Sequence, residues 1–125
     1  MLKKSFLATA ALLACASSMA FAAPAKVADS AKGKVLVDSH GMTLYTFAKD
    51  SAGKSVCTGQ CLANWPAFTA AASAKDADGY SVISRDDGSK QWAYKGQALY
   101  TWVKDAKPGD VTGDGVGGNW NVAKP

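Results

Sequence analysis

The 125-residue chain carries 14 lysine and arginine residues against ten acidic residues, all of them aspartate, for a formal net charge of +4. A nucleic-acid interface needs its cations clustered on one face, and these lysines are scattered, so we expect no nucleic-acid partner. A chain of this length forms one small domain with a limited core.

Residues 1–22 have the three parts of a secretory signal peptide. Lys3 and Lys4 precede an apolar run over Phe6–Cys15, and Ala20–Ala22 form a small-x-small cleavage site. The run is shorter than the ~20 apolar residues that a membrane-spanning helix requires. We therefore expect cleavage at the end of this segment and an extracytoplasmic protein, with the periplasm as its compartment.

A second processing route is open at the same end of the chain. The segment Leu12-Leu13-Ala14-Cys15 resembles a lipobox, in which the cysteine is acylated and becomes the new N-terminus. Leucine is an unfavourable residue directly before Ala14 in such a site, so plain cleavage is favoured. Acylation of Cys15 would make the protein an outer-membrane lipoprotein, and we expect contact with a membrane only in that case.

The mature chain begins with a small, polar, proline-containing segment. This composition predicts a flexible lead-in over residues 23–32, followed by a β domain over residues 33–125. The first hairpin is predicted to pair Lys34–Val37 with Met42–Phe47 across a turn at Asp38–Gly41.

Short strands and turns are predicted for the rest of the chain. The alanine-rich stretch at residues 67–78 is compatible with a connector or a short helix. No stretch shows helical amphipathicity over a dozen residues, so the predicted fold class is all-β. The predicted strands, in chain order, are Tyr80–Ser84, Lys90–Tyr94, Ala98–Trp102 and, after a glycine-rich loop at Asp110–Gly118, Asn119–Ala123.

The chain contains an internal repeat. Gly41–Asp50 has the sequence GMTLYTFAKD, and Gly96–Asp105 has the sequence GQALYTWVKD, so the repeat offset in residue numbering is 96 − 41 = 55. A repeat in register without a gap predicts two similar hairpin-based units within one compact domain. We place these repeats at about residues 33–66 and 88–123 and expect a pseudo-twofold relation between them.

Alternation along the repeated strands predicts how the halves associate. Tyr45 and Phe47 share one side of their strand, and Tyr100 and Trp102 share the equivalent side. A lone hairpin with one aromatic face is marginally stable in water, so we expect the two aromatic faces to bury each other. The tryptophans that end the two repeats are expected to close this core: Trp65 and Trp120.

Several sequence motifs of the chain also occur in one known protein family. The motif Y-x-[FWY]-x-x-D occurs at residues 45–50 and 100–105. Three further motifs follow the order found in that family: C-x-x-x-C-x-x-x-W-P at residues 57–66, Q-W-x-Y-x-G at residues 91–96 and G-D-x-x-G-D-G at residues 109–115. Through them the chain resembles a family of bacterial secreted proteins and predicted lipoproteins with tandem repeats. The resemblance implies export and a repeated architecture. It implies no catalytic residue, because the activity of the family is not established.

Cys57 and Cys61 are the only cysteines beyond the signal segment, and the equivalent positions of the second repeat hold Thr112 and Val116. In an oxidising compartment we predict a structural disulfide in a non-helical loop, contributing on the order of 2 kcal/mol in the chain-entropy model. A redox-active pair and a soft-metal site remain open. The alternative function is therefore a small redox or metal-handling protein.

Two other segments of the sequence contain residues that can bind metals. His40 and Met42 suit Cu(I), but they flank a glycine at a predicted turn, which explains them equally well. Asp110, Thr112 and Asp114 occupy positions 1, 3 and 5 of a calcium-type loop whose position 12 lacks the chelating glutamate. A glycine-rich turn accounts for the same residues, so we expect no metal and no cofactor.

Asp50 and Asp105 follow the two aromatic strands at the same spacing. Each carboxylate is expected to accept backbone N–H groups as its strand ends. The other interpretation is a pair of related ligand sites, one formed by Tyr45 and Asp50 and the other by Tyr100 and Asp105.

The chain has no glutamate, one histidine and no nucleophile-elbow or phosphate-binding motif, so we predict that it is not an enzyme. The predicted function is a non-catalytic exported module of the bacterial envelope, either binding or structural. Its expected partner is an unidentified envelope component or ligand.

Overall fold

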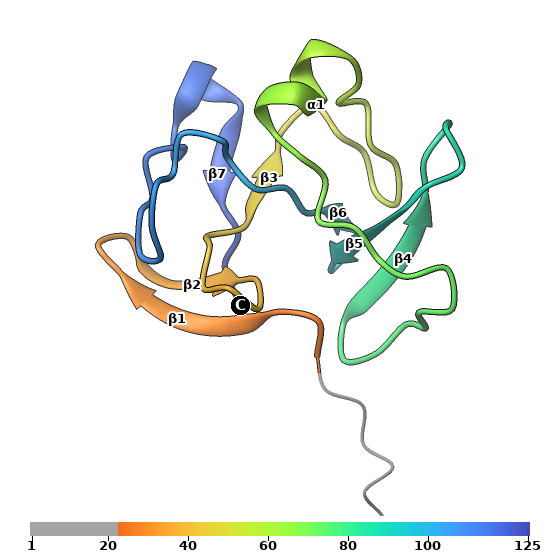
Figure 1. Cartoon of the computed structure of the whole chain (residues 1–125), viewed down its shortest axis with the longest axis horizontal. Helices are drawn as coiled ribbons and strands as arrows, with labels where there is room; N and C mark the ends of the chain where they lie inside the picture. The colour runs from red at the N-terminus through yellow and green to blue at the C-terminus, as the bar shows by residue number, and fades with distance from the viewer. Residues whose placement is uncertain (1–22) are drawn as a thin grey trace, which may run out of the picture.

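Short antiparallel strands form the framework of the protein, and over residues 23–125 helix is confined to two single turns (Figure 1). The computed structural model describes residues 23–125, so the predicted signal peptide and Cys15 lie outside the described residues. The all-β prediction is confirmed. The elements are β1 (Lys26–Ser30), β2 (Gly33–Val37), β3 (Tyr45–Phe47), α1 (Gln60–Asn64), β4 (Tyr80–Ser84), β5 (Lys90–Tyr94), β6 (Gln97–Ala98), the 3₁₀ turn η2 (Val116–Gly118) and β7 (Trp120–Val122).

Strand β1 corrects the prediction of a flexible lead-in over residues 23–32. It pairs with β2 along its whole length, from Lys26 opposite Val37 to Ser30 opposite Gly33. The Ser30 hydroxyl closes the turn by donating to the Gly33 carbonyl at 2.7 Å. The sequence of β1 lacks alternating apolar residues, so its strand character comes from pairing with the buried strand β2.

The hairpin predicted for Lys34–Val37 and Met42–Phe47 forms only in part. Its turn is as expected, with the Gly41 N–H donating to the Asp38 carbonyl at 3.0 Å. Beyond the bridge between Val37 and Thr43, the second segment leaves β2 and continues as β3 beside β7. On the edge of β2 away from β1, the Leu36 N–H donates to the Ala123 carbonyl at 2.9 Å. The residue after β7 therefore takes the place beside β2 that a full hairpin would give to the second segment.

The β4–β5 hairpin agrees with the prediction, but the strand predicted at Ala98–Trp102 is shortened to β6 at Gln97–Ala98. Strands β4 and β5 pair from Tyr80 opposite Tyr94 to Ser84 opposite Lys90, and β6 adds a short third strand to β5. The alanine-rich stretch before it is an extended connector, because Ala67 and Thr69 form bridges to neighbouring strands.

The two repeats are interlocked at the middle of the molecule. Strand β3 of the first repeat pairs with β7 of the second, with Tyr45 opposite Val122. The equivalent contact, with the roles of the repeats exchanged, joins Tyr100 of the second repeat to Ala67 of the first. Tyr45 and Tyr100 also exchange two backbone hydrogen bonds of 2.8 and 3.0 Å. Each repeat therefore supplies the closing strand of the other, as a pseudo-twofold relation requires.

The aromatic faces bury each other as predicted, in a four-ring stack. Trp65 and Trp120 lie parallel at the centre, with ring centroids 3.8 Å apart. Trp102 covers the outer face of Trp65 at 3.9 Å, and Phe47 covers that of Trp120 at 4.2 Å. Each stacked pair joins a ring of one repeat to a ring of the other. A pair of this kind stabilises the fold by about 0.5–1.5 kcal/mol beyond burial of its surface, and it forms only when both repeats are folded.

A second core lies on the other side of the same strands. Leu44 and Leu99 are fully buried there, and they pack with Leu36, Tyr80 and Ala123. The central strands thus bury both faces.

The interlocked strands predict that neither half folds alone. We expect a fragment of residues 23–75 and a fragment of residues 76–125 each to be unfolded as monomers, because each lacks the closing strand of its central pair. Mixing the two should restore the dispersed amide spectrum of the intact protein, measured by ¹H–¹⁵N NMR. A dispersed spectrum from either monomeric fragment would contradict the interlocked arrangement.

Candidate functional site

The four motif residues meet crosswise between the repeats. The Tyr45 hydroxyl donates to the Asp105 carboxylate at 2.6 Å, and the Tyr100 hydroxyl donates to the Asp50 carboxylate at 2.6 Å. The alternative interpretation, which grouped each tyrosine with the aspartate of its own motif, is therefore wrong. The favoured interpretation is correct in that each carboxylate accepts a backbone N–H group, from Val56 and from Thr112. The tyrosine and the aspartate of each motif therefore lie in different sites, and each site contains residues of both repeats.

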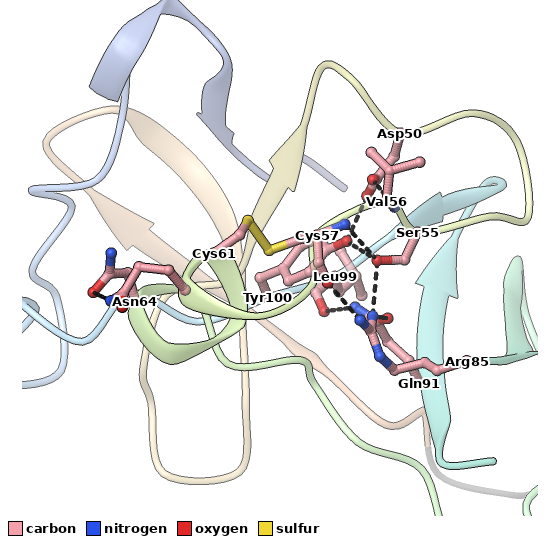
Figure 2. Close-up of a disulfide and its surroundings, with 11 residues drawn as sticks. Asp50, Ser55, Val56, Cys57, Cys61, Asn64, Arg85, Gln91, Leu99 and Tyr100 are labelled. Carbon is pink, nitrogen blue, oxygen red and sulfur yellow. Dashed lines mark hydrogen bonds between the residues drawn. A yellow bond between two sulfur atoms is a disulfide. The ribbon is translucent and has the colours of Figure 1, made fainter. Parts of the chain in front are cut away.

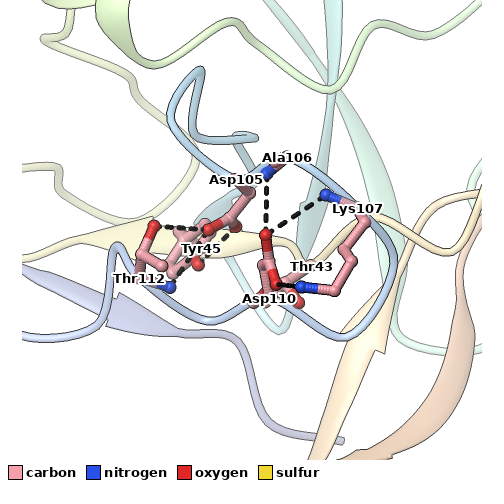
Figure 3. A network of polar contacts seen from close by, with 7 residues as sticks. All are labelled: Thr43, Tyr45, Asp105, Ala106, Lys107, Asp110 and Thr112. Carbon is pink, nitrogen blue, oxygen red and sulfur yellow. Dashed lines mark hydrogen bonds and ion pairs between the residues drawn. The ribbon is translucent and has the colours of Figure 1, made fainter.

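The Tyr45 site is closed around its carboxylate (Figure 3). Asp105 is only 8% exposed, and its second oxygen accepts the backbone N–H and the hydroxyl of Thr112 at 3.0 and 2.6 Å. The Gly113 N–H donates to the Tyr45 hydroxyl at 3.2 Å. A Cβ on Gly113 would lie 2.9 Å from the rings of Tyr45 and Trp65, so this loop can approach the core only with glycine.

The Tyr100 site has a different set of neighbours (Figure 2). Asp50 accepts the Val56 N–H at 2.8 Å, and the Ser55 hydroxyl contacts the Tyr100 hydroxyl. Because Tyr100 donates its proton to Asp50, Ser55 is the donor in that second contact.

Arg85 connects this site to the disulfide loop. Its guanidinium donates to Ser55 Oγ at 2.8 Å, to Gln91 Oε1 at 2.7 Å and to the Cys57 carbonyl. Gln91 is fully buried and donates to the Leu99 carbonyl at 2.8 Å. Sequence reasoning did not identify Ser55, Arg85 or Gln91. The one usable signal was that Arg85 is the only arginine of the chain.

Burial controls the protonation of both tyrosines. Removal from water raises the pKa of the Tyr45 hydroxyl well above its usual range, and the adjacent Asp105 carboxylate raises this pKa further. Burial also raises the pKa of the Tyr100 hydroxyl, and the hydrogen bond to the Asp50 carboxylate raises it further. Both hydroxyls therefore stay neutral donors at physiological pH.

This protonation state decides what the Ser55 cluster can do chemically. A serine nucleophile needs a neighbouring base that accepts its proton. Tyr100 holds its own proton toward Asp50 and is fully buried, so it does not serve as that base. The cluster ties the loop of the first repeat to the β4–β5 hairpin.

The predicted disulfide is confirmed between Cys57 and Cys61. Cys57 is fully buried and precedes α1, while Cys61 is half-buried and lies inside α1. The expected non-helical loop is therefore correct for Cys57 and wrong for Cys61. The second repeat forms its own helical turn, η2, at the equivalent place without a disulfide.

The candidate calcium ligands face different partners. Asp110 accepts from the Ala106 and Lys107 N–H groups and from Lys107 Nζ (Figure 3), and these donors hold the pKa of its carboxyl below the usual range. Thr112 donates to Asp105, and Asp114 accepts the Val122 N–H at 2.9 Å. Across residues 23–125 no three His, Cys, Asp or Glu side chains gather as a metal site.

The candidate copper ligands lie at the turn that the sequence indicated. The Asp38 carboxylate accepts the His40 and Met42 N–H groups at 2.9 and 3.0 Å, and His40 is exposed. This is the Asx-type geometry that a tight turn uses.

A family model described as a secreted repeat of unknown function matches residues 26–69 and again residues 81–124. The chain belongs to this family. The first residues of the two matches differ by 81 − 26 = 55 and their last residues by 124 − 69 = 55. This is the offset of the internal repeat. The match begins at β1, so each repeat is longer than the sequence alone indicated. No curated protein and no solved structure matches the chain.

The description of the family as secreted agrees with an extracytoplasmic location. Among the described residues, no helix has the length and apolar character of a membrane span.

The tyrosine–aspartate bonds predict a loss of stability in alkali. Since the folded pKa values are raised above the ordinary value of about 10, the folded state holds protons that the unfolded state releases. This stabilisation is complete below about pH 10 and falls as the pH rises further. We expect the free energy of unfolding, from urea titrations, to decline above pH 10, and less steeply in the double variant Tyr45→Phe, Tyr100→Phe.

At neutral pH each single Tyr→Phe change should lower stability by about 1.5–3 kcal/mol, because it removes a hydrogen bond to a charged group. An unchanged slope in the double variant would show that other groups cause the alkaline decline.

The disulfide is expected to add stability without being required for folding. The double variant Cys57→Ser, Cys61→Ser should keep the amide NMR pattern of the wild type and lose on the order of 2 kcal/mol in urea unfolding. Reduced wild-type protein provides the matched control and should match the variant. An unfolded variant would mean that the first repeat, unlike the second, depends on its cross-link.

Proposed function

We propose that the protein is a non-catalytic, exported binding module of the bacterial cell envelope. The observation that carries this proposal is the crosswise use of the repeated motif. Both tyrosines are fully buried, and their hydroxyls are bonded to carboxylates of the other repeat. The motif residues therefore maintain a rigid scaffold, and the surface is left for recognition.

The internal chemistry of the domain supports a role without turnover. Every buried side-chain nitrogen and oxygen among the described residues has a hydrogen-bond partner. An active site requires groups held ready for a substrate, and the strongest polar cluster, at Arg85, is occupied by its own contacts. Of the four candidate ligand-binding residues, only Asp50 lines a surface hollow. The other three are buried: Tyr45, Tyr100 and Asp105.

The compartment follows from the predicted leader. We infer a periplasmic protein after cleavage at Ala22, or an outer-membrane lipoprotein if Cys15 is acylated. The partner is another envelope component, and a membrane is contacted only through the lipid. The disulfide fits an oxidising compartment, and we assign it a structural role because Cys57 is inaccessible.

Affinity capture from envelope extract tests the proposal. Immobilised protein of residues 23–125 should retain one envelope component, and that component, once purified, should bind in a defined ratio by calorimetry. A bait carrying Trp65→Ala and Trp120→Ala is the matched control, because it lacks the central stack and keeps the charge. Equal retention by both baits, or specific turnover in a substrate screen, would contradict a folded, non-catalytic binding module.

A further inference from the structure

The outer edge of strand β1 is open, whereas the equivalent edge of the second repeat is covered. Strand β1 pairs with β2 on one side only. Figure 1 shows it at the outside of the molecule, with no other described strand beyond it. An edge strand of this kind carries backbone N–H and C=O groups that a further strand can use.

The hydrogen bonds of β2 show which residues of β1 face outward. Leu36 directs both backbone groups away from β1, because its N–H donates to the Ala123 carbonyl and its carbonyl accepts the Leu44 N–H, each at 2.9 Å. Along an antiparallel pair, residues that bond to each other alternate with residues that face apart. Val27 lies opposite Leu36, so it faces away from β2, and Asp29 does the same.

These outward backbone groups are unpaired in the described part of the chain. Within residues 23–125, neither the N–H nor the C=O of Val27 or Asp29 forms a hydrogen bond with another segment. Asp29 forms an ion pair with Lys34 at 2.7 Å through its side chain, which leaves its backbone groups free. The Val27 side chain is 53% exposed. Strand β1 therefore presents an open edge with an apolar side chain beside it.

The second repeat covers the equivalent edge with its own chain. Val82 stands at the repeat offset from Val27, because 82 − 27 = 55, and it lies in β4, which pairs with β5. The Val82 N–H faces away from β5 and donates to the Asp76 carboxylate at 2.9 Å. Next to it, Tyr80 and Ala77 exchange backbone hydrogen bonds of 2.8 and 2.9 Å. The connector before β4 therefore occupies this edge.

The first repeat lacks the residue that provides this cover. By the same offset, Asp76 corresponds to Phe21, which has no carboxylate and belongs to the predicted signal segment. Cleavage after Ala22 would remove it from the mature chain. The duplicated architecture therefore has one edge that its own chain covers and one edge that can accept a strand from another molecule.

The sequence of β1 is compatible with antiparallel pairing to a second copy of itself. Outward-facing residues must lie opposite each other, so the alignment that uses the whole strand places Val27 opposite Asp29 of the second copy and Ala28 opposite Ala28. Lys26 then lies opposite Ser30, and no like charges are directly opposed. Other alignments oppose Lys26 to Lys26 or Asp29 to Asp29, which is unfavourable, or leave part of the strand unpaired.

We propose that the protein forms a dimer in which β1 pairs antiparallel with β1 of a second copy. The β1–β2 pairs of both copies then form one continuous sheet, and each Val27 is covered by the neighbouring strand. Such an interface is isologous and closes after two copies, and the covered edge of β4 does not extend the assembly. Because the shared strand is short, the dimer is weak and depends on protein concentration. This assembly goes beyond the proposed binding function, which does not require it.

Sedimentation equilibrium and NMR dilution of ¹⁵N-labelled protein of residues 23–125 test the dimer. We expect the average mass to rise from monomer toward dimer at concentrations up to about 1 mM, a range that detects weak association. The amide signals of Val27 and Asp29 should shift over the same range, because their N–H groups gain carbonyl partners. The Val82 amide is the internal control and should not shift, since its N–H is already bonded.

The variant Val27→Pro separates the interface from the fold. Proline removes the outward N–H and places its ring on the open edge, while Lys26 and Ala28 keep their bonds to β2. This variant should remain a monomer over the same concentration range. Its melting temperature should stay close to that of the wild-type monomer.

Two charged substitutions at Val27 test the alignment. Val27→Asp puts a like charge opposite Asp29 of the second copy at both symmetry-related places. It should raise the dimer dissociation constant roughly two- to thirtyfold, the range expected for two like-charged cross-strand pairs. Val27→Lys puts an opposite charge there and should leave the constant unchanged or lower it. Position 27 is exposed in the monomer, so both variants should fold.

Several results would overturn the proposal. A wild-type protein that stays monomeric up to about 1 mM would reject the dimer, and a dimer retained by Val27→Pro would assign it to another surface. Equal weakening by Val27→Asp and Val27→Lys would reject the alignment. Amide shifts at Val27 and Asp29 that appear only when envelope extract is added would assign the edge to a strand of another protein.

Discussion

The two hydrogen bonds from Tyr45 to Asp105 and from Tyr100 to Asp50 hold the structure together at its pseudo-twofold axis. Each joins a fully buried tyrosine of one repeat to a carboxylate of the other. Asp105 is buried as well, so its bond lies where an unpaired carboxylate is costly. The four-ring stack and the exchanged closing strands likewise join residues of one repeat to residues of the other. We therefore expect folding of one repeat to depend on folding of the other.

This dependence explains why the motif is repeated and why it does not report on function. Side chains required by the scaffold must occur twice, since each repeat completes its partner. Residues that occur once are released from that requirement. The disulfide and the Arg85 cluster belong to this second class.

Sequence patterns succeeded where the determining contacts are local. The turn at Asp38–Gly41 and the β4–β5 hairpin follow from turn chemistry and alternation within a single hairpin, and the structure contains both. Strand β1 escaped prediction because nothing in Lys26–Ser30 is apolar and periodic. The tyrosine–aspartate partners were assigned wrongly for another reason. In a duplicated chain, spacing alone does not distinguish a contact within a repeat from its equivalent between repeats.

The sequence by itself determined the duplication, the all-β class, the disulfide partners and the membership of a secreted family, because each depends on residue types at short or fixed spacing. The tertiary structure alone decided that β3 pairs with β7, and that each tyrosine of the motif meets the aspartate of the other repeat. Those two facts depend on contacts between residues far apart in the chain. Such contacts are selected by burial of both faces of the central strands, which no local pattern records.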